Sequence, residues 1–246
     1  MDILLFVVLF VGVATAGVTQ VVAGTGVRLI LPPLAVLVVG HEEGLRIALT
    51  LGLVMSLVMF LAERKDVLFR PFVTLGLPIA VTAPLWVFLV DFIPQPIAAR
   101  LAGVVAILAV VVSARQLRTG RLVGLRPAIL TGAGASALFA LGGAGGPELG
   151  AYARDNRWPE REARATVNAC IALAQVMVLG FMGFPTAIEP GFPVALGGLA
   201  VGLLLGAVAV RQLPKLTSVK IGRGVALALA GLAAMVLLFA GTLATT

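Results

Sequence analysis

Long apolar runs follow one another along the whole chain, separated by short polar or basic connections. A helix needs roughly 20 apolar residues to cross the hydrocarbon core of a bilayer. Seven runs approach that length: residues 3–23, 45–61, 72–90, 97–114, 163–182, 193–210 and 224–243. Three further stretches, residues 27–39, 128–141 and 145–153, are shorter or interrupted by glycine and proline. The pattern predicts an all-α polytopic membrane protein rather than a soluble domain with one anchor.

Two apolar stretches are broken by glycine, and each break is followed by one ionisable residue. The first break contains Gly24, Thr25 and Gly26 and is followed by Arg28, whereas the second lies at residues 142–146 and is followed by Glu148. Glycine interrupts a helix and leaves backbone N–H and C=O groups without helical partners. In a bilayer such groups are tolerated only where they are buried in protein or line a cavity. Paired interruptions in two halves of a chain indicate the binding site of a transporter.

Basic residues are concentrated in alternate connections between the apolar runs. The basic connections contain Arg64, Lys65 and Arg70; Arg115, Arg118, Arg121 and Arg126; Arg154, Arg157, Arg161 and Arg164; and Arg211, Lys215, Lys220 and Arg223. The connections at residues 91–96 and 183–192 are almost free of lysine and arginine. Because cytoplasmic loops carry the excess of basic residues, the basic connections are expected on the cytoplasmic side. With every weak stretch counted as a crossing, both termini are expected outside the cytoplasm, in a multi-pass protein of a bacterial-type plasma (inner) membrane.

The two halves of the chain resemble each other and contain an odd number of membrane elements each. Five elements precede the basic connection and five follow it, so the second half is expected in the opposite orientation. The series Glu42, Arg46, Thr50 recurs as Glu160, Arg164, Asn168 after the corresponding break. The sequence therefore predicts two inverted repeats, with glycine-broken helices or re-entrant segments, at residues 1–115 and 128–246. Residues 116–127 form the expected basic cytoplasmic linker.

Composition excludes several classes of function. The chain is 60% hydrophobic and 12% charged, so its isoelectric point near 11.0 reflects topology-setting loops rather than nucleic-acid binding. One cysteine, Cys170, and one histidine, His41, exclude a disulfide framework and a multi-histidine metal centre. The chain carries no nucleotide-binding loop and no hydrolase or zinc motif, so neither an enzyme nor a cofactor is expected. A non-transporting membrane subunit is the other alternative, although it would not need paired breaks.

The glycine motifs resemble those of the TauE/SafE sulfite-exporter family of small membrane permeases. Members carry a signature of the form G-x-G-G-G-x-x-x-P near the start of each half. The first copy here spans residues 24–32, in which Val27 and Arg28 replace two glycines, and the second spans residues 143–151, in which Pro147 replaces the fourth glycine and Ala151 the proline. The resemblance implies transport, and export in particular, of small sulfur-containing anions such as sulfite, thiosulfate or organosulfonates. An anion channel, or an exchanger of another small oxyanion or carboxylate, is the alternative.

Candidate substrate-binding residues follow from the breaks, because the N-termini of half-helices offer free N–H donors and positive potential. The candidates at the breaks are Gly24, Thr25, Gly26, Arg28, Gly143, Gly145 and Gly146, and those on the following helices are Thr50 and Asn168. Each choice has an alternative. The glycines could serve close helix packing, and Thr50 and Asn168 could bond between helices. The expected partners are a small anion and the lipid bilayer, with no metal and no nucleic acid; a homodimer is left open.

Arg28 and Glu148 allow more than one interpretation. A guanidinium binds a pair of sulfite or sulfonate oxygens through its planar fork. Alternatively, Arg28 lies near the cytoplasmic end and extends to water, or pairs permanently with Glu148. Glu148 is either a proton-coupling carboxylate or that salt-bridge partner. Gln20 is expected to bond between helices.

Overall fold

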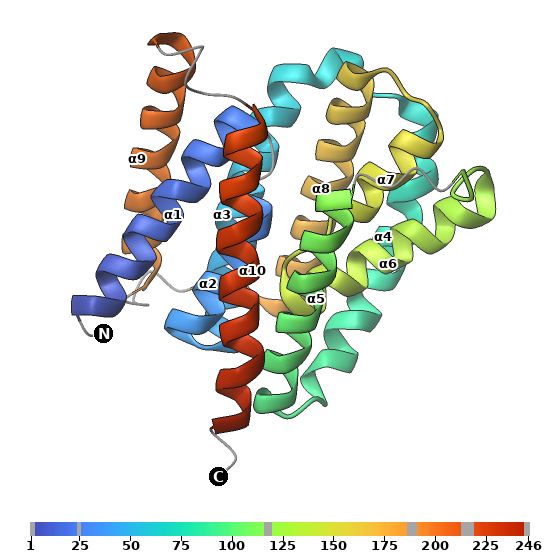
Figure 1. Ribbon diagram of the computed structural model, residues 1–246. Coiled ribbons are helices and arrows are strands. Elements are labelled where there is room, and N and C mark those ends of the chain that lie inside the picture. The colour runs from blue at the N-terminus through green and yellow to red at the C-terminus, as the bar shows by residue number, and fades with distance from the viewer. Residues whose placement is uncertain (1–2, 24–25, 116–119, 186–190, 213–218, 244–246) are drawn as a thin grey trace.

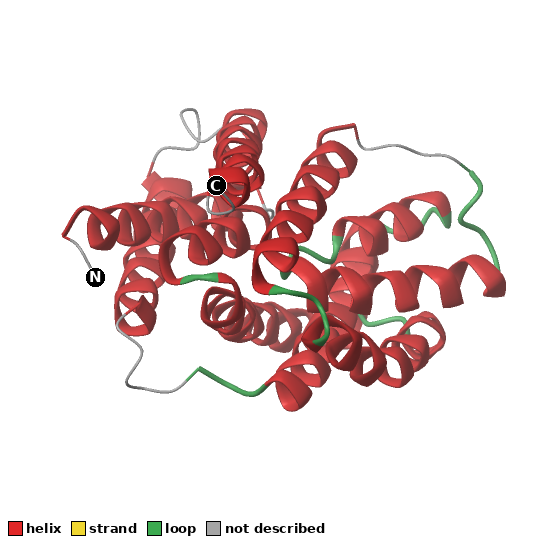
Figure 2. Cartoon of the chain, turned by 90° about the horizontal axis from the view of Figure 1, so that it is seen from below, coloured by secondary structure: helices red, strands yellow, loops and turns green. Residues whose placement is uncertain are grey.

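The computed structural model describes residues 3–23, 26–115, 120–185, 191–212 and 219–243, and every element in these ranges is a helix (Figure 2). The helices are α1 (Ile3–Ala23), α2 (Gly26–Val39), α3 (His41–Glu63), the 3-10 turn η1 (Arg64–Asp66), α4 (Phe69–Asp91), α5 (Gln95–Arg115), α6 (Leu125–Gly142), α7 (Pro147–Asp155), α8 (Glu160–Met182), α9 (Gly191–Gln212) and α10 (Val219–Leu243). All seven expected spans and all three weak stretches are therefore confirmed as helices.

Five helical stretches in the described part of the chain are long and apolar enough to cross a membrane: His41–Asp66, Phe69–Asp91, Gln95–Arg115, Leu125–Gly142 and Glu160–Met182. The fourth corresponds to a stretch that the sequence marked as weak. It is longer than expected because its first turn begins at Leu125, before the apolar run. The chain is a multi-pass membrane protein by the length and composition of these helices.

Both glycine breaks fall where the sequence places them. Helix α6 ends at Gly142, and Gly143 adopts a left-handed conformation with φ of 65° that terminates the helix. Gly146 has φ of 131°, and Pro147 then begins α7, a position that suits proline because the first N–H of a helix has no helical partner. At the first break, α1 ends at Ala23 and α2 begins at Gly26, while Gly24 and Thr25 lie outside the described residues.

Helix α2 continues through Pro32 and Pro33. Proline has no N–H, so α2 lacks the usual bonds from these positions to the carbonyl groups of Arg28 and Leu29. The first turn of α2, which carries Arg28, is therefore less completely bonded than an ordinary helical turn.

The halves of the chain are interleaved in space. Helix α1 packs against α9, α4 against α6 and α8, and α5 against α10, while α3 and α8 lie side by side (Figure 1). One core cluster joins α3 and α4 to α6, α7 and α8, and the other joins α1, α2, α3 and α5 to α9 and α10. Helix α3 contributes to both clusters, and Ala144 of the second break packs in the latter. The packing thus brings the two breaks into one central region.

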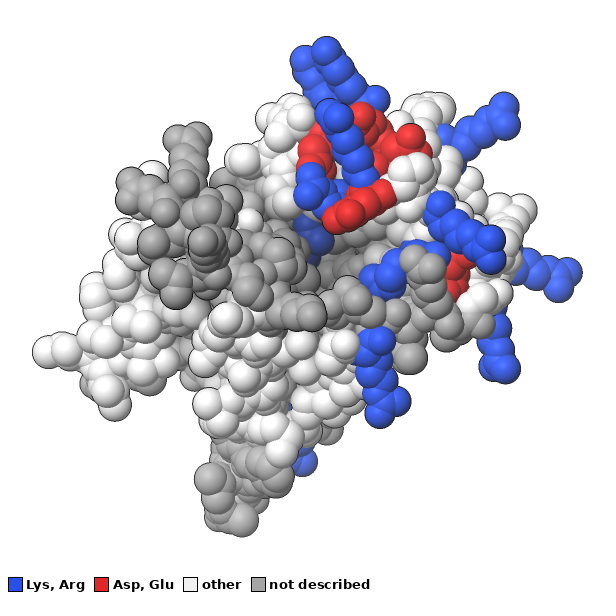
Figure 3. All heavy atoms as spheres, turned by 45° about the horizontal axis from the view of Figure 1, so that its top comes forward, with Lys and Arg blue, Asp and Glu red and all other residues white. Residues whose placement is uncertain are grey.

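Many of the lysine and arginine side chains gather at one end of the molecule. Figure 3 shows lysine and arginine around a group of aspartate and glutamate at the end that is uppermost in Figure 1. Helix α1 begins, and α10 ends, toward the opposite end. Two ion pairs join η1 and the end of α3 to α8 at the charged end: Arg161 binds Asp66 with Nε–Oδ2 of 2.8 Å, and Arg164 binds Glu63.

Candidate functional site

The two glycine breaks meet at the N-terminal ends of α2 and α7. A Cβ added to Gly146, just before α7, would lie 3.9 Å from Cδ of Arg28 in the first turn of α2. A Cβ added to Gly143 would lie 3.1 Å from Cβ of Pro32, one turn further along α2. Two helix N-termini, each with the positive end of a helix dipole, therefore converge on one region. Such ends attract and bind anions.

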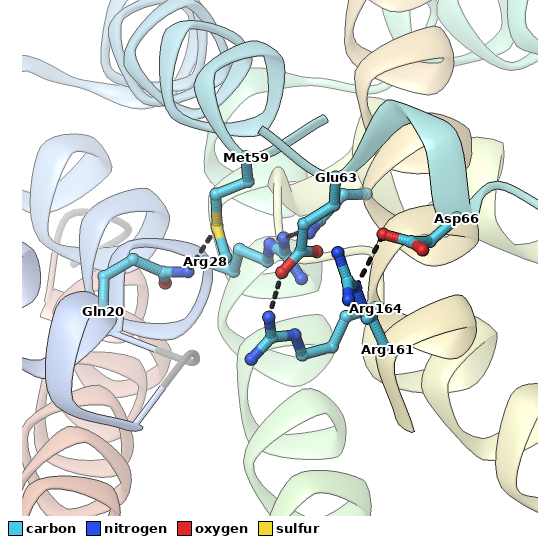
Figure 4. A network of polar contacts seen from close by, with 8 residues as sticks. Gln20, Arg28, Met59, Glu63, Asp66, Arg161 and Arg164 are labelled. Carbon is cyan, nitrogen blue, oxygen red and sulfur yellow. Dashed lines mark hydrogen bonds and ion pairs between the residues drawn. The ribbon is translucent and has the colours of Figure 1, made fainter. Parts of the chain in front are cut away.

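Arg28 reaches from this convergence toward α8. Its Nη2 donates a hydrogen bond to Oδ1 of Asn168. Asn168 is 2% exposed. Figure 4 shows Arg28 between the Gln20–Met59 contact and the Glu63–Arg164 ion pair. Asn168 is a neutral acceptor, so this hydrogen bond does not itself neutralise the positive charge of Arg28. The arrangement brings Arg28, Gly146 and Asn168 of the predicted set together.

Arg28 and Glu148 do not pair, contrary to the salt-bridge alternative. Among the ion pairs between described residues, none joins these two side chains. The Glu148 carboxylate turns back on its own helix instead, and its Oε1 accepts a hydrogen bond of 2.7 Å from the N–H of Gly146. An acidic residue in the first turn is stabilised by the helix dipole and by such N–H donors. Glu148 therefore occupies one donor of the second break.

Gln20 of α1 contacts both the start of α2 and α3 at the first break. Its Oε1 accepts a hydrogen bond of 3.2 Å from the N–H of Val27, and its Nε2 lies 3.4 Å from Sδ of Met59. Gln20 is 2% exposed and so joins α1, the start of α2 and α3, as the expected interhelical role requires. Its function as the N-terminal cap of α2 was missed. The signal available in the sequence is a glutamine a few residues before a glycine break.

The remaining glycines of the second break serve packing. A Cβ on Gly145 would lie 2.5 Å from Cδ2 of Phe139 and 2.9 Å from the carbonyl oxygen of Ala135, both on α6. A Cβ on Gly143 would lie 2.8 Å from Cδ1 of Leu45. The geometry at these two positions matches the close-packing alternative, whereas a Cβ on Gly146 would lie 3.1 Å from Cδ1 of Ile171 and 3.9 Å from Cδ of Arg28. At the first break, Gly26 begins α2, and Gly24 and Thr25 are not among the described residues.

Thr50 lies apart from Asn168 along the α3–α8 pair. The two helices run antiparallel, because Glu63 pairs with Arg164 near one end and Gly52 lies against Gln175 further along. Thr50 is therefore further from Asn168 than Gly52 is, and it lies near the end of α8. Its Oγ1 is buried and has no hydrogen-bond partner. The repeated series in the sequence therefore does not place Thr50 and Asn168 in one cluster.

A cavity of about 410 Å³ lies at the end of the molecule opposite the Asp66–Arg161 and Glu63–Arg164 ion pairs. Its walls come from the start of α3, the end of α4, the start of α5 and the end of α8, and include His41, Leu45, Arg46, Asp91 and Gln95. Arg46 is held by Glu42 and Glu43 of its own helix, with N–O distances of 2.6 and 3.1 Å.

Comparison of the chain with family models, with curated proteins and with solved structures finds no match.

Proposed function

We propose that the chain is a secondary transporter, acting as an exporter, of small sulfur-containing anions such as sulfite, thiosulfate or organosulfonates. The observation that carries the proposal is the convergence of the N-termini of α2 and α7 beside Arg28. The hydrogen bond of Arg28 goes to neutral Asn168, and none of the ion pairs between described residues includes Arg28. A planar guanidinium beside two helix N-termini is a combination that suits a small oxyanion. The choice of sulfur oxyanions rests on the resemblance of the glycine motifs to the TauE/SafE family.

The arrangement of helices supports an inverted repeat. If α1–α5 and α6–α10 are exchanged, the packing of α1 on α9 maps onto that of α6 on α4. The α3–α8 and α5–α10 pairs map onto themselves. A two-fold axis in the membrane plane has these consequences, and such axes relate the halves of many secondary transporters. The gathering of basic residues at one end supports a cytoplasmic location for that end and an extracytoplasmic location for both termini.

Flux through purified protein in proteoliposomes tests the proposal. Sulfite, thiosulfate, an organosulfonate, sulfate and a carboxylate are compared as substrates. We expect saturable flux of at least one sulfur anion, which Arg28→Ala abolishes. Arg70→Ala removes an exposed arginine at the start of α4 and is the matched control for charge. Flux of no anion in the panel, or equal flux in both variants, would contradict the proposal, and flux that does not saturate would assign a channel instead.

A further inference from the structure

A layer formed by Leu45 and Pro32 lies between the Arg28 region and the cavity, which is at the end that carries the α4–α5 connection. Leu45 lines the cavity, and its Cδ1 would lie 2.8 Å from a Cβ at Gly143. Cβ of Pro32 would lie 3.1 Å from the same added Cβ. Leu45 is 0% exposed, so its side chain fills the space between the cavity wall and the second break.

The layer lies about one helical turn from the candidate site. Pro32 follows Arg28 by four residues on α2, a rise of roughly 6 Å. Gly146 follows Gly143 by three residues and lies against Arg28. The order from the cavity inward is therefore Leu45, then Gly143 with Pro32, then Gly146 with Arg28 and Asn168.

We propose that the cavity is the extracytoplasmic half of the substrate path and that Leu45 is the side chain that closes its inner end. The inference rests on the proposed function, because it takes the cavity to be part of the substrate's path. The position of Leu45 between the cavity and the second break does not depend on that function. Beyond Arg28, the path is closed by the Glu63–Arg164 and Asp66–Arg161 pairs between α3, η1 and α8. The structure is thus hollow at one end and held together by interhelical ion pairs at the other. Alternating access requires this asymmetry of any one state.

The charges at the cavity suit an exit path rather than a tight binding site. Arg46 is the cation in its wall, and Glu42 and Glu43 already neutralise it. Asp91 adds a further negative charge. An anion would therefore be held more weakly here than beside Arg28, so the cavity favours release outward over retention.

Thiol labelling tests the closure independently of transport. In a Cys170→Ala background, Asn168→Cys places a reporter beyond the layer, and Gln95→Cys places one in the cavity. Both are treated with sulfonatoethyl methanethiosulfonate from the side that carries the α4–α5 connection. We expect rapid labelling at position 95 and slow labelling at position 168. Leu45→Ala should then raise the labelling rate at position 168 by about tenfold or more, because it opens a space that the layer cannot refill completely.

Leu49→Ala is the matched control, since Leu49 is also 0% exposed and belongs to the same core cluster one turn along α3 but does not line the cavity. It should leave the rate at position 168 unchanged. Arg28→Cys serves as a second reporter if Asn168→Cys does not elute as folded protein. Equal rates with Leu45→Ala and Leu49→Ala, or no labelling at position 95, would overturn the inference. Because the assay needs no substrate, the result is independent of whether sulfur anions are transported.

Discussion

Arg28 combines a position inside an apolar helix with a neutral partner. An arginine deep in a membrane helix costs about 2.5–3.5 kcal/mol on insertion scales, and one hydrogen bond to Asn168 offsets only part of that cost. An ion pair with Glu148 would compensate the charge more fully, but the carboxylate is bound to the N–H of Gly146. A bound anion would supply a compensating charge, which is why we propose Arg28 as a substrate contact.

Substitution of Arg28 tests this placement through affinity. Arg28→Lys keeps the charge and loses the planar fork, so the affinity for sulfite should fall about tenfold, whereas Arg28→Ala should lower it about a hundredfold, or roughly 2.7 kcal/mol. Isothermal titration calorimetry on the detergent-purified variants measures both effects. Unchanged affinity together with lowered thermal stability would assign Arg28 a structural role only.

The Arg28–Asn168 hydrogen bond gives a second test at the residue scale. Asn168→Asp places a carboxylate against the guanidinium, and this carboxylate competes with the substrate for the same charge. We expect Asn168→Asp to bind sulfite more weakly than Asn168→Ala, although both lose the native amide. The same titration compares the two variants, and the reverse order would mean that the guanidinium does not face the anion.

Gly146 is required by its backbone conformation as well as by its neighbours. Its φ of 131° lies in a region that other residues rarely adopt, and a Cβ there would lie 3.1 Å from Cδ1 of Ile171. Gly146→Ala should therefore lower stability by about 1–3 kcal/mol. Gly134→Ala is the control, because Gly134 is helical with open space around it. Thermal unfolding of the two variants should separate them, with Gly134→Ala neutral or slightly stabilising.

At the scale of elements, the short helix α2 depends on α1 for the start of its backbone bonding. The N–H of Val27 has no partner within α2, as in the first turn of any helix, and Gln20 of α1 supplies the acceptor. The same side chain contacts Met59 of α3. One glutamine thus fixes the position of the helix that carries Arg28.

Removal of the Gln20 side chain should reveal this dependence. Gln20→Ala leaves a buried N–H unsatisfied and should cost about 1–3 kcal/mol of the free energy of unfolding. Thr15→Ala, also on α1, removes a hydroxyl that bonds only to the carbonyl of Val11 in its own helix and should change stability by less than about 0.5 kcal/mol. Denaturant titration in mixed micelles measures both, and equal losses would contradict the capping role.

At the scale of the whole molecule, the clustered charges predict an orientation in the membrane. Basic residues gather at the end that carries η1, and the α4–α5 connection lies at the other end. In intact cells that carry the Cys170→Ala variant, a membrane-impermeant thiol reagent should label Phe92→Cys and not Lys65→Cys. Permeabilised cells should label both, since both positions are exposed. Labelling of position 65 alone in intact cells would reverse the orientation.

The sequence alone was sufficient to predict the helices of this protein. Helix lengths follow from apolar runs that must satisfy their own backbone hydrogen bonds in a bilayer. The second break follows from glycine and proline, because only glycine readily adopts the conformations of Gly143 and Gly146, and proline favours the first turn of α7. These constraints act within a few neighbouring residues, so the residue types at those positions are enough to predict them.

Only the tertiary structure decided which predicted residues share a site. Asn168 lies beside Arg28 while Thr50 does not, because the register of α3 against α8 sets their separation. Gly145 packs against Phe139 and Gly146 against Arg28, although the two are neighbours in the chain. Glu148 bonds to its own helix rather than to Arg28 because two backbone segments, distant in sequence, fix the directions of both side chains. Such pairings depend on how helices from the two halves pack, and no local pattern encodes that packing.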